Sequence, residues 1–160
     1  MKIIDDVLNR KDFDTIKQTM LGINFSWFYT EGISEKNIND EYKDYYLTHM
    51  FLYDYQKSAW FDMLNPIFKI LDPIVMRRVK GNMYPSTPEI VHHNSHTDAP
   101  YKHKGAIFYV NTNNGFTVLH DGTKVQSIEN RLLLFDASLE HHSTSCTDEN
   151  TRVNININYF

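Results

Sequence analysis

The sequence predicts a mixed α+β protein in which helices come first and a β-rich half follows. The 160-residue chain is 41% hydrophobic and 14% aromatic, which is enough apolar side chain to build one core. Residues 1–72 contain helix-type periodicity, whereas residues 73–160 contain short runs of β-branched and aromatic residues between turn signals. Short strands at such a regular pitch are typical of a sandwich or barrel. We therefore expect one domain over 1–160, with helical support in 1–72 and a β core in 73–160.

Two segments of the first half are predicted to be helical. KDFDTIKQTML, at 11–21, places Phe13, Ile16, Met20 and Leu21 at helical spacing. The longer segment 39–71 contains seven side chains near a 3.6-residue period, namely Tyr42, Tyr45, Tyr46, His49, Met50, Tyr53 and Trp60. Pro66 is expected to begin a new turn or end a helix there. We interpret the aromatic stripe as a face that packs helices against a sheet.

The second half is predicted to form strands. The candidate runs are IVMRRVKGNMY (74–84), GAIFYVN (105–111), FTVLH (116–120), TKVQSI (123–128), RLLLFDA (131–137) and RVNININYF (152–160). Asp121–Gly122, between the third and fourth runs, predicts a tight hairpin. The last run alternates, so that Val153, Ile155, Ile157 and Tyr159 share one face and Arg152, Asn154, Asn156 and Asn158 share the other.

Charge and composition narrow the range of partners. A net charge of −4 and a pI near 6.0 give no electrostatic footprint for nucleic acid, so nucleic acid is disfavoured. The short basic runs at 77–80 and 102–104 could bind an acidic substrate or be solvated strand faces, and we favour the second interpretation. No apolar run approaches the roughly 18 residues of a membrane span, and the charged N-terminus lacks the apolar centre of a signal peptide. The single cysteine, Cys146, is typical of a reducing compartment, so we expect a cytoplasmic location. The sequence does not predict an oligomeric state.

The stretch HHNSHTDAP, at 92–100, indicates a metal site. His96 and Asp98 are two residues apart, and an extended strand places such residues on one face. His141 or His142, after the 131–137 run, could supply a third ligand. Two histidines and one carboxylate leave coordination positions open, which is the arrangement of non-heme Fe(II) oxygenases. A structural zinc site would close its shell with four protein ligands, usually including cysteines.

An arginine near the C-terminus indicates an anion anchor. Arg152 begins the last predicted strand, ten or eleven residues after the candidate third ligand. If the cosubstrate is a dicarboxylate, one carboxylate chelates iron and the other needs a cation. The planar guanidinium of arginine binds a carboxylate through two donors, which lysine cannot do.

Residues 74–160 resemble the Fe(II)/2-oxoglutarate-dependent dioxygenase superfamily, and within it the prolyl 4-hydroxylase-like branch, including small members encoded by bacteriophages. The resemblance rests on HTD (96–98), NNGFTVLHDG (113–122), NRLLLFDASLEHHSTSCTD (130–148) and TRVNININYF (151–160). Gly115, Thr117, Arg131, Phe135, His141 and Arg152 match the order of the branch's motifs. RRVKGNMY (77–84) resembles the strand that precedes its HxD motif. His93 departs from the branch, where a tyrosine is common three residues before the first ligand.

The resemblance implies a double-stranded β-helix (jelly-roll) core in the C-terminal half with N-terminal supporting helices. It implies that His96, Asp98 and His141 bind Fe(II) and that Arg152 binds the distal carboxylate of 2-oxoglutarate. Further candidates for the cosubstrate pocket are Tyr84, Thr117 and Asn82. The implied reaction consumes O₂, hydroxylates an unactivated C–H bond of a peptidyl proline or a small molecule, and releases succinate and CO₂, with ascorbate as a supporting reductant.

Two other classes of function remain open at this point. Jelly-roll proteins also include modules that bind sugars or small acids without catalysis, because fold does not dictate function. A cupin-type metal-dependent hydrolase or isomerase would use more histidines and would not require Arg152. Further histidines in the β half, namely His92, His93, His103 and His120, keep this alternative in view.

Overall fold

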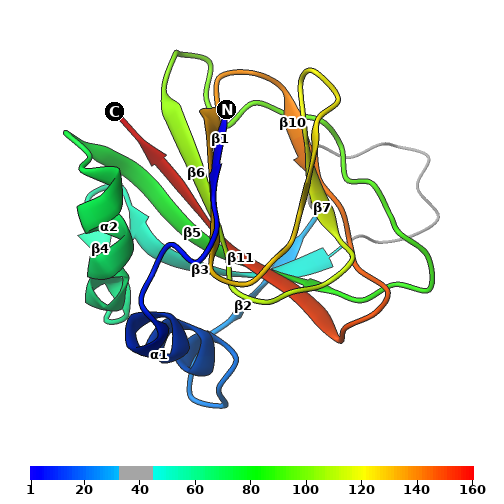
Figure 1. Cartoon of the computed structure of the whole chain (residues 1–160), viewed down its shortest axis with the longest axis horizontal. Helices are drawn as coiled ribbons and strands as arrows, with labels where there is room; N and C mark the ends of the chain where they lie inside the picture. Colours follow the sequence, from blue (N-terminus) through cyan, green and yellow to red (C-terminus); the bar gives the residue numbers. More distant parts are fainter. Residues whose placement is uncertain (33–44) are drawn as a thin grey trace.

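Two antiparallel sheets face each other in the computed structural model, which describes residues 1–32 and 45–160 (Figure 1). The larger, eight-stranded sheet has the order β1-β9-β6-β11-β5-β3-β2, with β4 paired to β3. Its strands are β1 (Lys2–Ile4), β2 (Phe28–Glu31), β3 (Tyr45–Tyr53), β4 (Gln56–Lys57), β5 (Met76–Pro85), β6 (Lys104–Tyr109), β9 (Arg131–Asp136) and β11 (Thr151–Tyr159). The smaller sheet has the order β10-β7-β8, from β7 (Phe116–Leu119), β8 (Lys124–Gln126) and β10 (His141–Ser143).

Helices cover the outer face of the larger sheet. They are α1 (Arg10–Met20), α2 (Asn65–Leu71) and the short 3₁₀ helix η1 (Phe61–Leu64). The predicted helix α1 is confirmed: Asn9 caps it by accepting from the Asp12 N–H at 3.0 Å, and Phe13 and Ile16 are buried. Pro66 lies in the first turn of α2, where its missing N–H costs no helical hydrogen bond. Among the described residues, no helix combines the length and apolar character that crossing a membrane requires.

The predicted helical segment 39–71 is wrong over residues 45–60, where strands β3 and β4 form, and is confirmed over residues 61–71, where η1 and α2 lie. Residues 39–44 of that prediction lie outside the described residues. β3 pairs with β5 from Leu47↔Met83 to Tyr53↔Arg78. Its Tyr46 is buried toward the smaller sheet, whereas Phe51 is buried toward the helices. Burial on both faces removes the two-residue alternation that identifies a strand, and aromatic residues favour strands.

The central strand β11 divides the interior into an apolar and a polar side. Val153, Ile155, Ile157 and Tyr159 belong to the core beneath the helices, as the alternation predicts. On the opposite face, Arg152, Asn154, Asn156 and Asn158 are all buried between the two sheets. The rest of this inter-sheet space is filled by a smaller apolar cluster that includes Ile107, Leu119 and Phe135. β11 therefore presents a row of buried polar groups to the space between the sheets.

The predicted hairpin at Asp121–Gly122 is confirmed. β7 and β8 pair antiparallel from Phe116↔Gln126 to Val118↔Lys124. Gly122 has φ +81°, a left-handed conformation that glycine adopts without steric cost. The hairpin holds Thr117 in the middle of the smaller sheet, where its side chain is 1% exposed.

Candidate metal centre

The chain segment 92–98 runs beside β10 and brings distant histidines together. The backbone N–H groups of His96 and His141 each donate to the carbonyl of the other at 3.0 Å. Asp98 is fixed by its own N–H, which donates to the Ala137 carbonyl at 3.1 Å. This pairing extends the smaller sheet by one strand-like segment, so residues 45 positions apart in sequence lie side by side.

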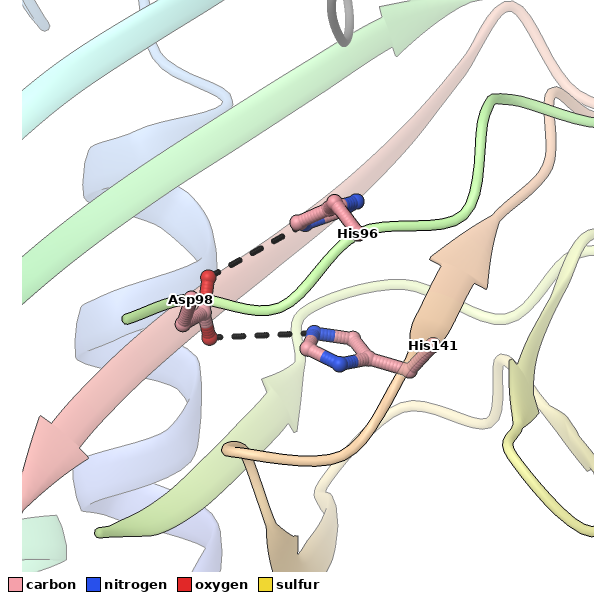
Figure 2. A group of neighbouring side chains, drawn as sticks. All are labelled: His96, Asp98 and His141. Carbon is pink, nitrogen blue, oxygen red and sulfur yellow. Dashed lines mark ion pairs between the residues drawn. The ribbon is translucent and has the colours of Figure 1, made fainter. Parts of the chain in front are cut away.

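His96, Asp98 and His141 point at a common position (Figure 2). Nε2 of His96 lies 3.9 Å from Oδ1 of Asp98, and Nε2 of His141 lies 3.7 Å from Oδ2. One ligand atom from each residue falls within 4.8 Å of the others. Nδ1 of His96 faces the Asn94 carbonyl at 3.2 Å, and Nδ1 of His141 faces the Leu139 carbonyl at 3.0 Å. Because a carbonyl only accepts, Nδ1 carries the proton and Nε2 presents its lone pair to the centre.

The donor set fits a divalent metal ion. Nε2 of His141 is buried and has no hydrogen-bond partner among the described residues. An unpaired buried polar atom costs about 1–3 kcal/mol, and coordination of a metal ion would satisfy it. Two imidazole nitrogens and one carboxylate form the donor set that suits Fe(II) and leaves positions for other ligands. The predicted ligands are therefore placed where Fe(II) could bind.

The Asp98 carboxylate is held by three donors from the larger sheet. Nη2 of Arg78 donates to Oδ1 at 2.5 Å, and Nδ2 of Asn156 and Nδ2 of Asn158 donate to Oδ2 at 3.2 and 2.8 Å. Burial alone raises the pKa of Asp98, but Arg78, His141 and the two amides outweigh it and lower the pKa to about 2. The carboxylate is therefore ionised, and oriented, at any pH near neutrality.

The neighbouring histidines lie outside this triad. His142 contacts His92 instead, and its Nε2 lies 3.0 Å from Nδ1 of His92. His93 is buried, with Nδ1 2.6 Å from the Ser143 hydroxyl and its ring 5.0 Å from the ring of Tyr84. Burial first, and then the nearby Arg152, lower the pKa of His93 to about 3. Of the adjacent residues His141 and His142, His141 is therefore the one that faces Asp98. His93 is an uncharged side chain that lines the interior.

Arg152 is the largest fully buried side chain of the described residues, and its exposed fraction is 0%. Its donors meet only neutral acceptors: the Ser127 hydroxyl at 2.7 Å, the Thr117 hydroxyl at 3.1 Å and the Thr144 carbonyl at 3.3 Å. The rings of Tyr84 and Tyr109 flank the guanidinium. No ion pair of the described residues includes Arg152. A buried cation without a counter-ion is costly, so this position favours an anionic ligand.

A narrow cavity, here called the inner cavity, connects the triad with the surroundings of Arg152. Its lining includes the predicted residues Tyr84, Thr117 and Asn82 as well as His96, Asp98 and His141. Thr117 accepts from the Tyr109 hydroxyl at 2.9 Å in addition to Arg152. Asn82 donates to the Asn154 side chain at 2.9 Å, and its own Oδ1 has no partner among the described residues. The cavity therefore offers polar groups along its whole length.

Three further residues line this interior that the sequence analysis did not place there. Tyr46 stacks on Tyr84 with ring centroids 5.5 Å apart, and burial raises its pKa to about 12. Lys80 also lines the inner cavity, and Arg78 contacts Asp98, so the interpretation of 77–80 as a solvated strand face is wrong for these two residues. Strand alternation is the sequence signal that could have placed Arg78 and Lys80 in this interior. One face of β5 presents four residues that pair with the polar residues of β11, namely Arg78, Lys80, Asn82 and Tyr84.

No family model and no curated protein matches the sequence, but solved structures match the fold. A prolyl hydroxylase from Trichoplax adhaerens, in complex with a hypoxia inducible factor peptide fragment, is 15% identical, with a TM-score of 0.70 over 99% of this chain and 82% of its own. A 2OG-Fe(II) oxygenase family oxidoreductase from Burkholderia pseudomallei is 11% identical, with a TM-score of 0.71 over 98% of this chain and 83% of its own. A Pseudomonas putida prolyl-4-hydroxylase is 11% identical, with a TM-score of 0.59 over 99% and 91%.

These matches confirm the predicted fold class. The chain has the α+β architecture of the 2OG-Fe(II) oxygenases, with a double-stranded β-helix core and supporting helices α1 and α2. Identities of 11–15% establish this architecture but do not assign roles to individual residues. The roles of the site residues depend on their geometry in this chain.

Proposed function

We propose that this protein is an Fe(II)- and 2-oxoglutarate-dependent dioxygenase that hydroxylates an unactivated C–H bond and releases succinate and CO₂. One observation carries the proposal: a single interior contains both an open two-histidine, one-carboxylate donor set and a fully buried arginine without a counter-ion. A metal site alone fits many hydrolases, and a buried arginine alone fits many binding proteins. The presence of both in one interior fits an enzyme in which a bound metal ion acts together with a dicarboxylate cosubstrate.

His96, Asp98 and His141 would hold the iron. Bound Fe(II) would supply the redox chemistry that activates O₂ with 2-oxoglutarate as the electron source. The chain itself fixes the ligands: backbone carbonyls hold both imidazoles in the Nδ1–H tautomer, and Arg78, Asn156 and Asn158 orient the carboxylate. Such outer contacts set ligand orientation and metal affinity.

Arg152 would bind the distal carboxylate of 2-oxoglutarate, with Thr117 and Tyr84 beside it. All three are buried, so the charge pair would form in a region from which water is excluded. Asn82, with its unpaired Oδ1, lies along the inner cavity and would contact the cosubstrate between its two ends. Ascorbate, which would restore Fe(II) after uncoupled turnover, and a cytoplasmic location remain predictions.

The organic substrate is a peptidyl proline or a small molecule. Support for a peptide comes from the Trichoplax protein, whose structure contains a bound peptide fragment. The hydroxylated C–H bond must reach the open side of the triad, beyond the atoms that the cosubstrate occupies.

Anaerobic titration with Fe(II) and then 2-oxoglutarate tests the proposal. Isothermal calorimetry should find one metal site per chain, and 2-oxoglutarate should bind the metal-loaded protein more tightly than the metal-free protein. His96→Ala should abolish metal binding, because it removes one of three ligands. His92→Ala, which changes a neighbouring histidine outside the triad, is the matched control. If the wild type bound neither ligand, the proposal would be wrong. Turnover with Co(II) or Zn(II) in the absence of 2-oxoglutarate would instead indicate a cupin-type hydrolase or isomerase.

A further inference from the structure

A second, wider cavity lies beside the metal centre. This outer cavity has a volume of about 380 Å³ and is bordered by Tyr53, Arg77, Arg78, Asp98, Tyr101 and Asn158. Its walls come from the end of β3, the start of β5 and the segment after Asp98. Asp98 lines both the inner and the outer cavity, so a molecule in the outer cavity would lie next to one of the proposed metal ligands. The volume is in the range of small-molecule sites, roughly 300–1,000 Å³.

Two adjacent guanidinium groups line the outer cavity. Arg78 donates through Nε to the Asn158 side chain at 3.0 Å and through Nη2 to Asp98. Arg77 donates through Nε to the Tyr101 hydroxyl at 3.3 Å. A guanidinium has five N–H donors, so each arginine retains donors for a ligand. Bidentate binding of a carboxylate is the interaction to which this group is best suited.

The balance of charge around the two cavities is positive. Among the described residues, four cations face two carboxylates, namely Arg77, Arg78, Lys80 and Arg152 against Asp54 and Asp98. Bound Fe(II) and the dianion 2-oxoglutarate would cancel each other. Two cations would then remain without a counter-charge, and Arg77 and Arg78 line the outer cavity, not the inner cavity that holds the residues proposed for the cosubstrate. An uncompensated cationic cavity attracts an anionic ligand.

We propose that the outer cavity is the substrate pocket of this site and that its substrate carries a carboxylate bound by Arg77 and Arg78. The inference rests on the proposed function, because the substrate must reach the metal that Asp98 binds. Tyr53 and Tyr101, which are 60% and 42% exposed, provide flat apolar walls next to the two cations. The carboxylate belongs either to a free acid or to an acidic side chain of a peptide. Both sources present the same group to the same arginines.

Paramagnetic relaxation by Mn(II) tests this assignment without turnover. Protein loaded with Mn(II) and 2-oxoglutarate is mixed with benzoate or with the uncharged isostere benzamide, and the relaxation of the probe protons is measured by NMR. Benzoate should relax several-fold faster than benzamide. A second arm compares blocked aspartate amide with blocked asparagine amide. Preference for benzoate alone indicates a free acid, and preference for the aspartate probe indicates an acidic peptide.

Arg77→Gln is the decisive variant, because Arg77 does not contact the triad. It should weaken binding of the preferred carboxylate probe about tenfold, the effect of losing one charge-assisted hydrogen bond. Arg10→Gln, on the far side of the larger sheet in α1, removes the same charge and should change nothing. If Mn(II) and 2-oxoglutarate bind but charged and neutral probes relax alike, the inference is overturned while the proposed function stands. The inference would also be overturned if both Arg77→Gln and Arg78→Gln still bound the charged probe in preference to the neutral probe. If Mn(II) itself does not bind, the proposed function fails first.

Discussion

Replacement of Arg152 by methionine separates its role in binding from its role in packing. Methionine keeps much of the side-chain length and removes the charge. The variant loses three hydrogen bonds to neutral acceptors, on Ser127, Thr144 and Thr117. Because the donor is charged, each bond is taken at about 1.5 kcal/mol, and this loss costs about 4–5 kcal/mol of stability. It is offset by relief from burying a cation without a counter-ion, an effect of several kcal/mol. We therefore expect the free energy of unfolding to change by less than about 2 kcal/mol.

Binding of 2-oxoglutarate should respond much more strongly. Two charge-assisted hydrogen bonds from the guanidinium to the distal carboxylate contribute about 3–5 kcal/mol together, so Kd should rise roughly 10²–10⁴-fold. Metal affinity should stay unchanged, because Arg152 has no contact with the triad. Anaerobic calorimetry of the metal-loaded protein measures the first quantity, and metal titration measures the second.

Arg131→Met is the matched control for this experiment. Arg131 lies on β9 and pairs with Asp5 at 2.5 Å, away from the inner cavity. Its loss should leave 2-oxoglutarate affinity within about twofold of the wild type. If Arg152→Met also bound 2-oxoglutarate with unchanged affinity, the assignment of Arg152 as the carboxylate anchor would be refuted. A large loss of stability in the metal-free protein would show that the guanidinium is compensated by the protein itself.

Three other outcomes follow from the structure. His141→Ala should abolish Fe(II) binding in calorimetry, whereas His142→Ala, whose ring faces His92, should retain it within about threefold. Phe13→Ala, at a residue 1% exposed beneath Phe108, should lower the free energy of unfolding in urea by about 3–5 kcal/mol without changing the metal affinity of the folded protein. Burial is the larger cause, and the nearby Arg78 the second, of a fall in the pKa of Lys80 from 10.5 to about 8. Between pH 8 and pH 10.5 the unfolded chain therefore binds more protons than the folded chain, so the contribution of Lys80 to the free energy of unfolding rises with pH. Lys80→Met also loses the Nζ contact with the Tyr46 hydroxyl, so it should raise the free energy of unfolding at pH 7 by at most about 3 kcal/mol. This gain should shrink as the pH rises from 8 to 10.5; a gain that grew with pH would contradict the burial of a charged lysine.

Elements with a local signal were predictable from the sequence. Helix α1 has apolar residues at helical spacing behind an asparagine cap, and the hairpin at Asp121–Gly122 has a residue pair that its turn requires. Strand β11 shows a two-residue alternation because its two faces meet different surroundings. In each case the determinants lie within a few residues of one another.

Elements defined by distant partners were not predictable. β3 is buried on both faces, so its aromatic residues gave a helical interpretation, and only its pairing with β5 makes it a strand. β1 and β10 have three residues each, too few for a period to be visible. The two-residue spacing of Arg78 and Lys80 was visible in the sequence. Which face of the strand turns inward was not visible, because it depends on the pairing of Arg78 with Asn158 and of Lys80 with Asn156.

The same distinction applies to the site. His96 and Asp98 have a local spacing that predicts a shared face. The choice between His141 and His142 could not be made from the sequence, because it depends on the backbone pairing with His96. This pairing turns the His141 ring toward Asp98. The outer contacts on Asp98 come from β5 and β11, which lie far from it in sequence.

Conversion of 2-oxoglutarate to succinate tests the central claim most directly. Purified protein is incubated with 2-oxoglutarate and O₂, and succinate is quantified with Fe(II), with Zn(II) and without metal. We expect succinate only with Fe(II) and O₂ together, at least at the slow rate of uncoupled turnover. Asp98→Ala should produce none. Absence of succinate from the Fe(II)-loaded wild type, despite binding of both ligands, would contradict the assignment of this protein as a dioxygenase.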